Sequence, residues 1–301
     1  MAERAATAGA LWFCLLVSGF VAGCDRKPAP EPVAEAQPAA ATGPLVTLAG
    51  AAEPATVGPG GTVTLVWRLQ SAEGWHLYGN GRNDSGFAPR VKLTLPPGWT
   101  AGPLLWPAPA RHVSAGDILD HIYEGELVLL QDVSIPADAA IGNNIQLRAR
   151  WEWLACRESC VPGLDSLVVN LAVDPAAPAT PASPALAAAR EQLPRPLPDG
   201  LLELTWEGST LRLDRVSPAS GRLTFMPDTD CAELVDLLHD GVGESLALRV
   251  ATAAGGDQGR AASVRGVLLV ESAGGPARAY TIDVPVDNRA GSDAGALPNG
   301  G

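Results

Sequence analysis

Two cysteines are the residues in this 301-residue sequence whose type and spacing best suit chemistry. Cys156 and Cys160 lie in the segment WEWLACRESCVPG. In one extended strand their Cα atoms would be about 13 Å apart, far beyond the ~4.4–6.8 Å that a disulfide allows. The chain must therefore turn at 157–159, and a hairpin with this short loop would place the cysteines opposite each other at bonding distance. In an oxidising compartment such a close pair is expected to form a disulfide.

The strand before this turn indicates which face Cys156 occupies. Apolar and polar side chains alternate over Ile145–Trp153, and Cys156 shares the parity of Arg148 and Arg150. We therefore expect Cys156 on the solvated face, where the two arginines favour its thiolate. A structural disulfide is more often buried, and a disulfide across so short a loop constrains the unfolded chain little. Both points favour exchange chemistry, and a structural disulfide is the alternative.

The first 24 residues resemble a targeting signal. The apolar run ALWFCLLVSGFVA is too short to cross about 30 Å of hydrocarbon but suits a signal peptide, which we place at 1–23. The run ends in VAGC, which resembles the bacterial lipobox, and this implies that Cys24 is acylated and begins the mature protein. We expect a periplasmic protein with a lipid anchor, and Asp25 favours the inner over the outer membrane. An ordinary secretory signal that contains a cysteine is the alternative.

Charge and composition exclude several classes of protein. The 21 Lys+Arg against 33 Asp+Glu give a net charge of −12, which argues against binding to nucleic acid or to an anionic membrane surface. Apolar residues make up 47% of the chain, enough for a core. The 33 glycines and 27 prolines favour turns and short strands over long helices. An all-α protein is therefore excluded.

Pro/Ala-rich stretches divide the chain into successive parts. We expect a tether at 24–44, a β-sandwich at 45–173, a linker with a short helix at 174–199, a second, smaller β-rich domain at 200–288 and a disordered tail at 289–301. The predicted strands cover 62–69, 90–95, 125–133 and 145–153, followed by 201–206, 210–216, 246–251, 263–271 and 279–286. Short strands at about ten-residue spacing predict an all-β fold of two antiparallel sandwiches.

Helices and aromatic residues complete this local analysis. One helix is predicted at 184–193 in the linker, and a second from Asp230 to His239, with Glu233 at the capping-box position. Six of the seven tryptophans after the signal fall in the first domain, where we expect most of them to form the core. Only Trp206 lies in the second.

The remaining candidate groups are weaker. The sequence contains no G-x-S-x-G, Walker or dinucleotide-binding motif in a suitable context. Cys231 is the odd thiol in the second predicted helix, either buried and inert or a partner in an intermolecular bond. No metal-ligand spacing is found among the histidines, which we expect at the surface or at strand ends: His76, His112, His121 and His239. A Cu(I) site formed by the cysteine pair with His112 or His121 is the alternative.

Several short motifs occur in the order expected of one module. They are GWHLY (74–78), NDSG (83–86), LWP (105–107), YEG (123–125) and WLAC-x3-CVPG (153–163). In this order they resemble the N-terminal periplasmic domain of the DsbD family of thiol:disulfide interchange proteins, including copper-sensitivity relatives such as ScsB. The resemblance covers about 45–175 and, loosely, 176–286. It implies an immunoglobulin-like sandwich whose pair, Cys156 and Cys160, cycles between dithiol and disulfide.

The resemblance also implies partners and a cap. In the family this domain takes electrons from a membrane-embedded relay and passes them to oxidised periplasmic thioredoxin-like proteins, while an aromatic residue on a cap loop shields the disulfide. Phe87, next to Gly86, is the candidate for that residue, and a core position is the alternative. The Cys-x3-Cys spacing is shorter than in the best-known enterobacterial members. We also expect a stand-alone lipoprotein without its own transmembrane relay, which therefore depends on a separate reductase.

These observations predict a membrane-anchored thiol-disulfide exchange protein, a protein-disulfide reductase or interchange component with Cys156 and Cys160 as its redox pair. No metal or other cofactor is expected, because sulfur alone carries the two electrons. The alternative function is a non-catalytic β-sandwich binding module with a structural disulfide, related to copper or to another partner.

Overall fold

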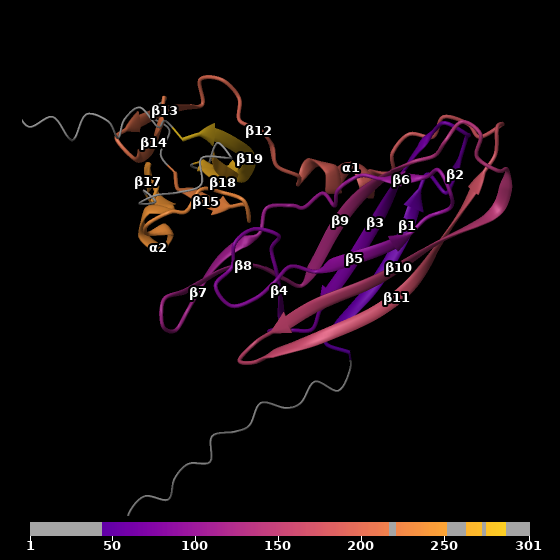
Figure 1. Cartoon of the computed structure of the whole chain (residues 1–301), viewed down its shortest axis with the longest axis horizontal. Coiled ribbons are helices and arrows are strands. Elements are labelled where there is room, and N and C mark those ends of the chain that lie inside the picture. The colour runs from indigo at the N-terminus through magenta and orange to yellow at the C-terminus, as the bar shows by residue number, and fades with distance from the viewer. Residues whose placement is uncertain (1–43, 217–220, 252–262, 273–274, 287–301) are drawn as a thin grey trace, which may run out of the picture. The chain divides into compact units, whose positions relative to one another are not determined.

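The computed structural model describes residues 44–216, 221–251, 263–272 and 275–286. In these residues the chain is all-β with two short helices (Figure 1), as the sequence predicts. The predicted signal peptide, the predicted lipidation site Cys24, nearly all of the predicted tether and the predicted tail lie outside the described residues. Neither of the two helices has the length and apolar character that a membrane-spanning helix needs.

Two sheets form the first, immunoglobulin-like sandwich. One sheet has the strand order β1 (Val46–Glu53), β3 (Thr62–Ser71), β9 (Glu126–Ser134), β6 (Thr100–Ala101). The other has the order β2 (Thr56–Val57), β11 (Cys160–Val173), β10 (Gly142–Cys156), β4 (His76–Tyr78), β8 (Ile118–Glu124), β7 (Ala110–Ser114), and β5 (Arg90–Thr94) also pairs with β10. The four strands predicted for this domain correspond to β3, β5, β9 and β10.

Alternation along the strands builds the core between these two sheets. On β10 the side chains of Leu147, Trp151 and Trp153 point inward and are buried. Trp151 meets Trp67 of β3 edge to face, with ring centroids 5.5 Å apart, an arrangement that aromatic pairs favour. Of the six tryptophans expected here, five are buried, and Trp106 is half-buried against the same core. The predicted role of most tryptophans is therefore confirmed.

The β10–β11 hairpin is the element that carries the cysteine pair. Figure 1 shows the two long strands running side by side to their turn. β5 pairs with β10 only at Arg148–Glu152. Nearer the turn, β4 pairs with β10 instead, with Leu77 opposite Ala155. The last residues of β10 are thus flanked by β11 on one side and β4 on the other.

A helix follows the sandwich where the sequence predicts one. α1 (Pro184–Glu191) begins with a proline, whose fixed φ suits the first turn, and the Ser183 hydroxyl caps it by accepting from the Leu186 backbone N–H at 3.1 Å. Leu186 is buried against Val66 and Leu130. The helix is therefore attached to the sandwich by its apolar face.

The second β-rich domain contains two sheets around a core of its own. One has the order β12 (Arg195–Pro196), β19 (Gly275–Pro285), β18 (Ser263–Ser272), β15 (Leu223–Pro227), β16 (Val242–Gly243). The other has the order β13 (Leu202–Glu207), β14 (Thr210–Arg215), β17 (Leu246–Arg249). All five strands predicted here are present, and β15, which carries the buried Phe225, is additional.

The helix predicted over 230–239 is wrong. The Ala232 backbone N–H donates to β18 at 2.7 Å, and the Val235 N–H donates to β17 at 2.8 Å. Only α2 (Leu237–Asp240) is helical. Bonds to two neighbouring strands satisfy these backbone groups, and this tertiary pairing overrides the local capping signal.

Candidate functional site

The turn between β10 and β11 places Cys156 and Cys160 directly opposite each other. They are register partners with Cα atoms 4.1 Å apart, and their sulfurs form a disulfide. The Arg157 N–H donates to the Ser159 carbonyl at 3.2 Å and closes the loop. The hairpin and the pairing predicted from the spacing are therefore present, while the role of the pair in exchange is a proposal made below.

The two cysteines differ in accessibility. Cys160 is exposed, whereas Cys156 is only 3% exposed. The expectation of a solvated Cys156 is therefore wrong, although the alternation behind it holds and Cys156 lies on the same side of β10 as Arg150. At this end of the strand that side is covered, because Tyr78 of β4 and Ile122 of β8 pack against Cys156.

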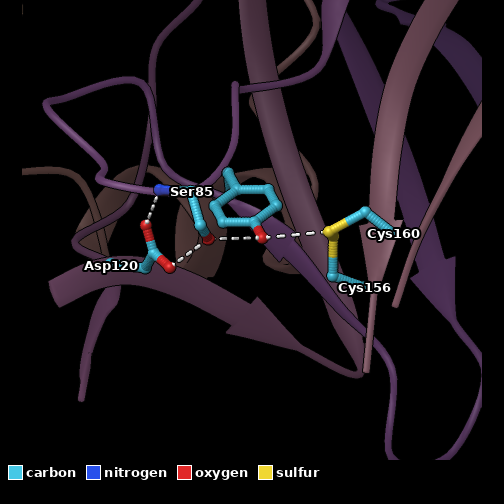
Figure 2. Close-up of a disulfide and its surroundings, with 5 residues drawn as sticks. Ser85, Asp120, Cys156 and Cys160 are labelled. Carbon is cyan, nitrogen blue, oxygen red and sulfur yellow. Dashed lines mark hydrogen bonds between the residues drawn. A yellow bond between two sulfur atoms is a disulfide. The ribbon is translucent and has the colours of Figure 1, made fainter. Parts of the chain in front are cut away.

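A chain of polar contacts leads from the disulfide to a buried carboxylate (Figure 2). The Tyr78 hydroxyl oxygen lies 3.5 Å from Cys160 Sγ and 3.0 Å from Ser85 Oγ. Ser85 donates to both oxygens of Asp120, through its hydroxyl at 2.5 Å and its backbone N–H at 3.0 Å. Tyr78 is 1% exposed and Asp120 3% exposed. No role is predicted from the sequence for Tyr78, Ser85 or Asp120, and no single motif connects them.

Hydrogen-bond chemistry gives this chain a direction. The Ser85 hydroxyl uses its one hydrogen to donate to Asp120, so the Tyr78 hydroxyl donates to Ser85 Oγ. The tyrosine oxygen consequently turns a lone pair towards Cys160. Burial raises the pKa of Tyr78, so its hydroxyl stays protonated at neutral pH. In the reduced protein a Cys160 thiol could donate to that oxygen, whereas a thiolate would find no donor there.

The loop before β5 is fastened to β8 by three consecutive side chains. Asn83 accepts the His121 backbone N–H at 2.7 Å, and Asp84 accepts the Leu119 N–H at 2.7 Å. Ser85 holds Asp120 as described. The NDS sequence thus attaches this loop to the strand that lines the disulfide.

Gly86 and Phe87 follow this attachment. A Cβ on Gly86 would lie 2.2 Å from a ring carbon of Tyr78, so the loop backbone rests directly on the tyrosine ring. Phe87 is 39% exposed, and the Arg90 guanidinium lies 5.1 Å from its ring centroid. The core alternative for Phe87 is therefore wrong. The aromatic residue in contact with the disulfide is Tyr78, and a cap role for Phe87 is a proposal.

Two histidines near the site are buried: His76 begins β4, a strand end as expected, whereas His121 lies inside β8, contrary to the expectation. His121 is 1% exposed, and its Nδ1 pairs with the Arg82 carbonyl oxygen at 2.9 Å. Burial lowers its pKa. The pKa of His76 is lowered as well, first by burial and then by the nearby charge of His112, whose ring centroid lies 5.6 Å away. Among the described residues no group of three His, Cys, Asp or Glu side chains is placed to hold a metal ion.

Cys231 belongs to the core of the second domain. It is a free, buried thiol, and burial raises its pKa. A buried thiol with a raised pKa is unreactive. This environment fits the inert alternative for Cys231.

Comparison with known families bears directly on the cysteine hairpin. Residues 45–172 match the family described as thiol:disulfide interchange protein DsbD, N-terminal. The match spans β1 to β11 and includes the Cys156–Cys160 hairpin, so the family resemblance of the sequence motifs is confirmed. The family is one of thiol-disulfide interchange. No curated protein matches the chain.

Solved structures include two similar domains of this kind. The N-terminal periplasmic domain of ScsB from Proteus mirabilis is 18% identical, with a TM-score of 0.49, and the alignment covers 80% of this chain and 93% of that one. The reduced DsbD N-terminal domain of Neisseria meningitidis is 15% identical, with a TM-score of 0.24, and the alignment covers 36% of this chain and 77% of that one.

Proposed function

We propose that this chain is a lipid-anchored periplasmic protein that passes reducing equivalents from a membrane-embedded reductase to thioredoxin-like proteins. One observation carries the proposal: the Cys156–Cys160 disulfide lies at a hairpin end with one cysteine exposed and the other buried. Exchange needs one sulfur that a partner can approach and a second that stays nearby to resolve the mixed disulfide. The DsbD N-terminal family of residues 45–172 supports the same chemistry.

The transfer proceeds in two balanced steps. In the reduced protein the Cys160 thiolate attacks the partner's disulfide, which breaks. One partner sulfur leaves as a thiolate, and a disulfide forms between Cys160 and the other. The Cys156 thiolate then attacks Cys160 Sγ, so the mixed disulfide breaks, the second partner sulfur leaves as a thiolate, and the Cys156–Cys160 disulfide forms again. Two electrons have passed to the partner, and the membrane reductase replaces them.

Accessibility assigns the two roles within the pair. Cys160 is exposed and meets the partner, while Cys156, beneath Tyr78 and Ile122, resolves. The Tyr78 oxygen would hold Cys160 as a thiol in the reduced protein, which limits its reaction with unintended disulfides until a partner docks.

The loop with Asn83, Ser85 and Phe87 serves as the cap in this proposal. Its support is the hydrogen bond from Tyr78 to Ser85 and the close packing of Gly86 on the tyrosine ring. A docking partner would displace Phe87, which is half-exposed. Phe87→Ala should then speed reduction of the disulfide by dithiothreitol, and an unchanged rate would remove Phe87 from the cap.

Trapping tests the proposed function. Cys156→Ser leaves Cys160 able to attack but removes the resolving thiol, so a covalent complex with a periplasmic thioredoxin-like protein should accumulate on non-reducing gels. Cys160→Ser is the matched control and should trap far less, because Cys156 is buried. If neither variant traps a partner while both remain folded, the exchange function is wrong.

Fractionation tests the proposed anchor separately. Cys24→Ser removes the acylated sulfur, and the protein should move from the membrane to the soluble periplasmic fraction. Unchanged fractionation would contradict the lipoprotein assignment but would have no bearing on the proposed exchange function.

A further inference from the structure

The outer face of β5 and β10 carries a group of positive side chains. We call the exposed residues Arg90, Lys92, Arg148 and Arg150 the basic face. The chain as a whole has a net charge of −12, so a cluster of positive side chains is unusual for it. Glu152 is the one carboxylate in the same rows of β5 and β10, and it lies 3.8 Å from Arg150, on which it acts only weakly because both side chains are 58% exposed.

The register shows that these charges face one another across the two strands. Arg150 is paired with Lys92, and Arg90 is paired with Glu152. Like charges directly opposite in a sheet are destabilising. Folding therefore does not account for the Arg150–Lys92 pair, and an anionic ligand on this face would.

The basic face lies on the same side of the β10–β11 hairpin as the disulfide. Cys156 has the parity of Arg148 and Arg150 on β10, and at about 3.3 Å per residue these lie roughly 26 Å and 20 Å from it. Arg90 is opposite Glu152, which lies roughly 13 Å from Cys156 along β10. A domain of about 100 residues has a radius of gyration of about 13 Å and so spans more than 30 Å. A partner of that size, seated over the exposed Cys160, would extend across the basic face.

Apolar side chains lie among these cations. Leu164 of β11 is 55% exposed and is register partner of Glu152, and Val168 is 39% exposed beside Arg148. Arginines mixed with exposed apolar groups are typical of protein interfaces.

We propose that the basic face is a docking surface for a cluster of carboxylates on the protein partner, placed about 13–26 Å from the partner's reactive cysteine. This inference rests on the proposed exchange function and adds a recognition element to it. An acidic protein patch is favoured over an anionic membrane because the face continues to the disulfide, and because the rest of this acidic chain would be repelled by lipid phosphates. Attraction of this kind speeds encounter and selects partners.

Two cysteine peptides provide the probe. One carries a cysteine, six Gly/Ser residues and four glutamates, and the other replaces the glutamates with glutamines. The initial rate at which each peptide thiol opens the Cys156–Cys160 disulfide is measured by alkylation quenching and mass spectrometry. We expect the glutamate peptide to react about tenfold faster at low salt, and the preference to disappear near 0.5 M salt.

Matched variants show whether the basic face causes the preference. Lys92→Gln with Arg150→Gln should abolish it, whereas Arg195→Gln with Arg278→Gln, an equal charge change at exposed positions of the second domain, should leave it intact. Equal rates for the two peptides on the unaltered chain, or a preference that survives the Lys92/Arg150 change, would overturn the proposal.

Two further measurements distinguish this proposal from a failure of the exchange function and from binding to lipid. Dithiothreitol, which carries no carboxylate, should open the disulfide at the same rate in the Lys92/Arg150 and Arg195/Arg278 variants. If it fails to open the disulfide at all, the exchange function fails rather than the docking surface. Binding to vesicles of 70% phosphatidylcholine and 30% phosphatidylglycerol that depends on Lys92 and Arg150, without any peptide preference, would assign the face to lipid and overturn the proposal.

Discussion

The hydroxyl oxygen of Tyr78 lies 3.5 Å from the sulfur of Cys160, and its other hydrogen-bond partner is Ser85. Because the Ser85 hydroxyl is itself committed to the Asp120 carboxylate, the Tyr78 hydroxyl donates to Ser85, and in the reduced protein its oxygen is free to accept a hydrogen bond from the Cys160 thiol. The hydroxyl therefore favours a thiol over a thiolate. In the reduced protein, the Tyr78 hydroxyl therefore acts most directly on the protonation state of Cys160.

Removing the hydroxyl should lower the pKa of the Cys160 thiol. Tyr78→Phe takes away the acceptor for the S–H, and Ser85→Ala frees the Tyr78 hydroxyl to donate to the thiolate, so both variants should act in the same direction. The pH dependence of alkylation by iodoacetamide in the reduced protein measures this pKa. A raised pKa in Tyr78→Phe would show that the hydrogen bond runs the opposite way.

Adding a methyl group at Gly86 should disturb the site. The new Cβ would meet the Tyr78 ring, so the ring or the loop must move, which costs about 1–3 kcal/mol of stability. We expect faster reduction of the disulfide by dithiothreitol. Gly58→Ala is the control, because its Cβ would meet only the Asp174 carbonyl oxygen, at 3.8 Å. Equal rates of reduction in the two variants would argue against close packing over the disulfide.

Stability should fall as the pH drops below about 6.5, the ordinary pKa of histidine. Burial lowers the pKa of His121 in the folded protein, so the unfolded chain binds a proton first and gains stability as the solution is acidified. This loss should be complete below the folded pKa. Urea unfolding of the chain and of His121→Gln between pH 8 and 5 measures it, and the variant should show a shallower decline. Identical slopes would contradict a buried, neutral His121.

Loss of the disulfide should leave the sandwich folded. Two cysteines four positions apart close a very short loop, so a chain with both changed to serine should lose at most about 2 kcal/mol of unfolding free energy. Trp151→Ala, in the centre of the core, should cost more, about 3–5 kcal/mol. Thermal and urea unfolding compare the two. A double serine variant that fails to fold would make the disulfide structural.

The sequence predicts nine of the nineteen described strands and the cysteine hairpin, because both depend on short-range patterns. Alternation marks β3 and β10, and the spacing of Cys156 and Cys160 requires a turn. The failures share one cause, which is contact between distant segments. Alternation places Cys156 on the outer side of β10, but only the folded sheet shows that β4 and β8 cover that side. Likewise, Asp120 is paired with a serine 35 positions away, and no local pattern reveals such a pair.

The predicted helix at 230–239 fails for the same reason. Its capping signal is local, whereas the strands that bond to Ala232 and Val235 follow it in the sequence. Burial of His121 also arises from tertiary packing. Local sequence patterns therefore predict structure best where neighbouring residues determine it. They predict it worst at the site, where the loop of Ser85, β8 and the β10–β11 hairpin come together.

The reduction potential of the Cys156–Cys160 pair tests the central claim most directly. It is measured by equilibrating the purified chain with dithiothreitol and glutathione buffers and quantifying the reduced fraction after alkylation. An exchange disulfide should lie between about −300 and −100 mV, the range of thiol-disulfide oxidoreductases. A potential below about −300 mV would mark the bond as structural and contradict the exchange function.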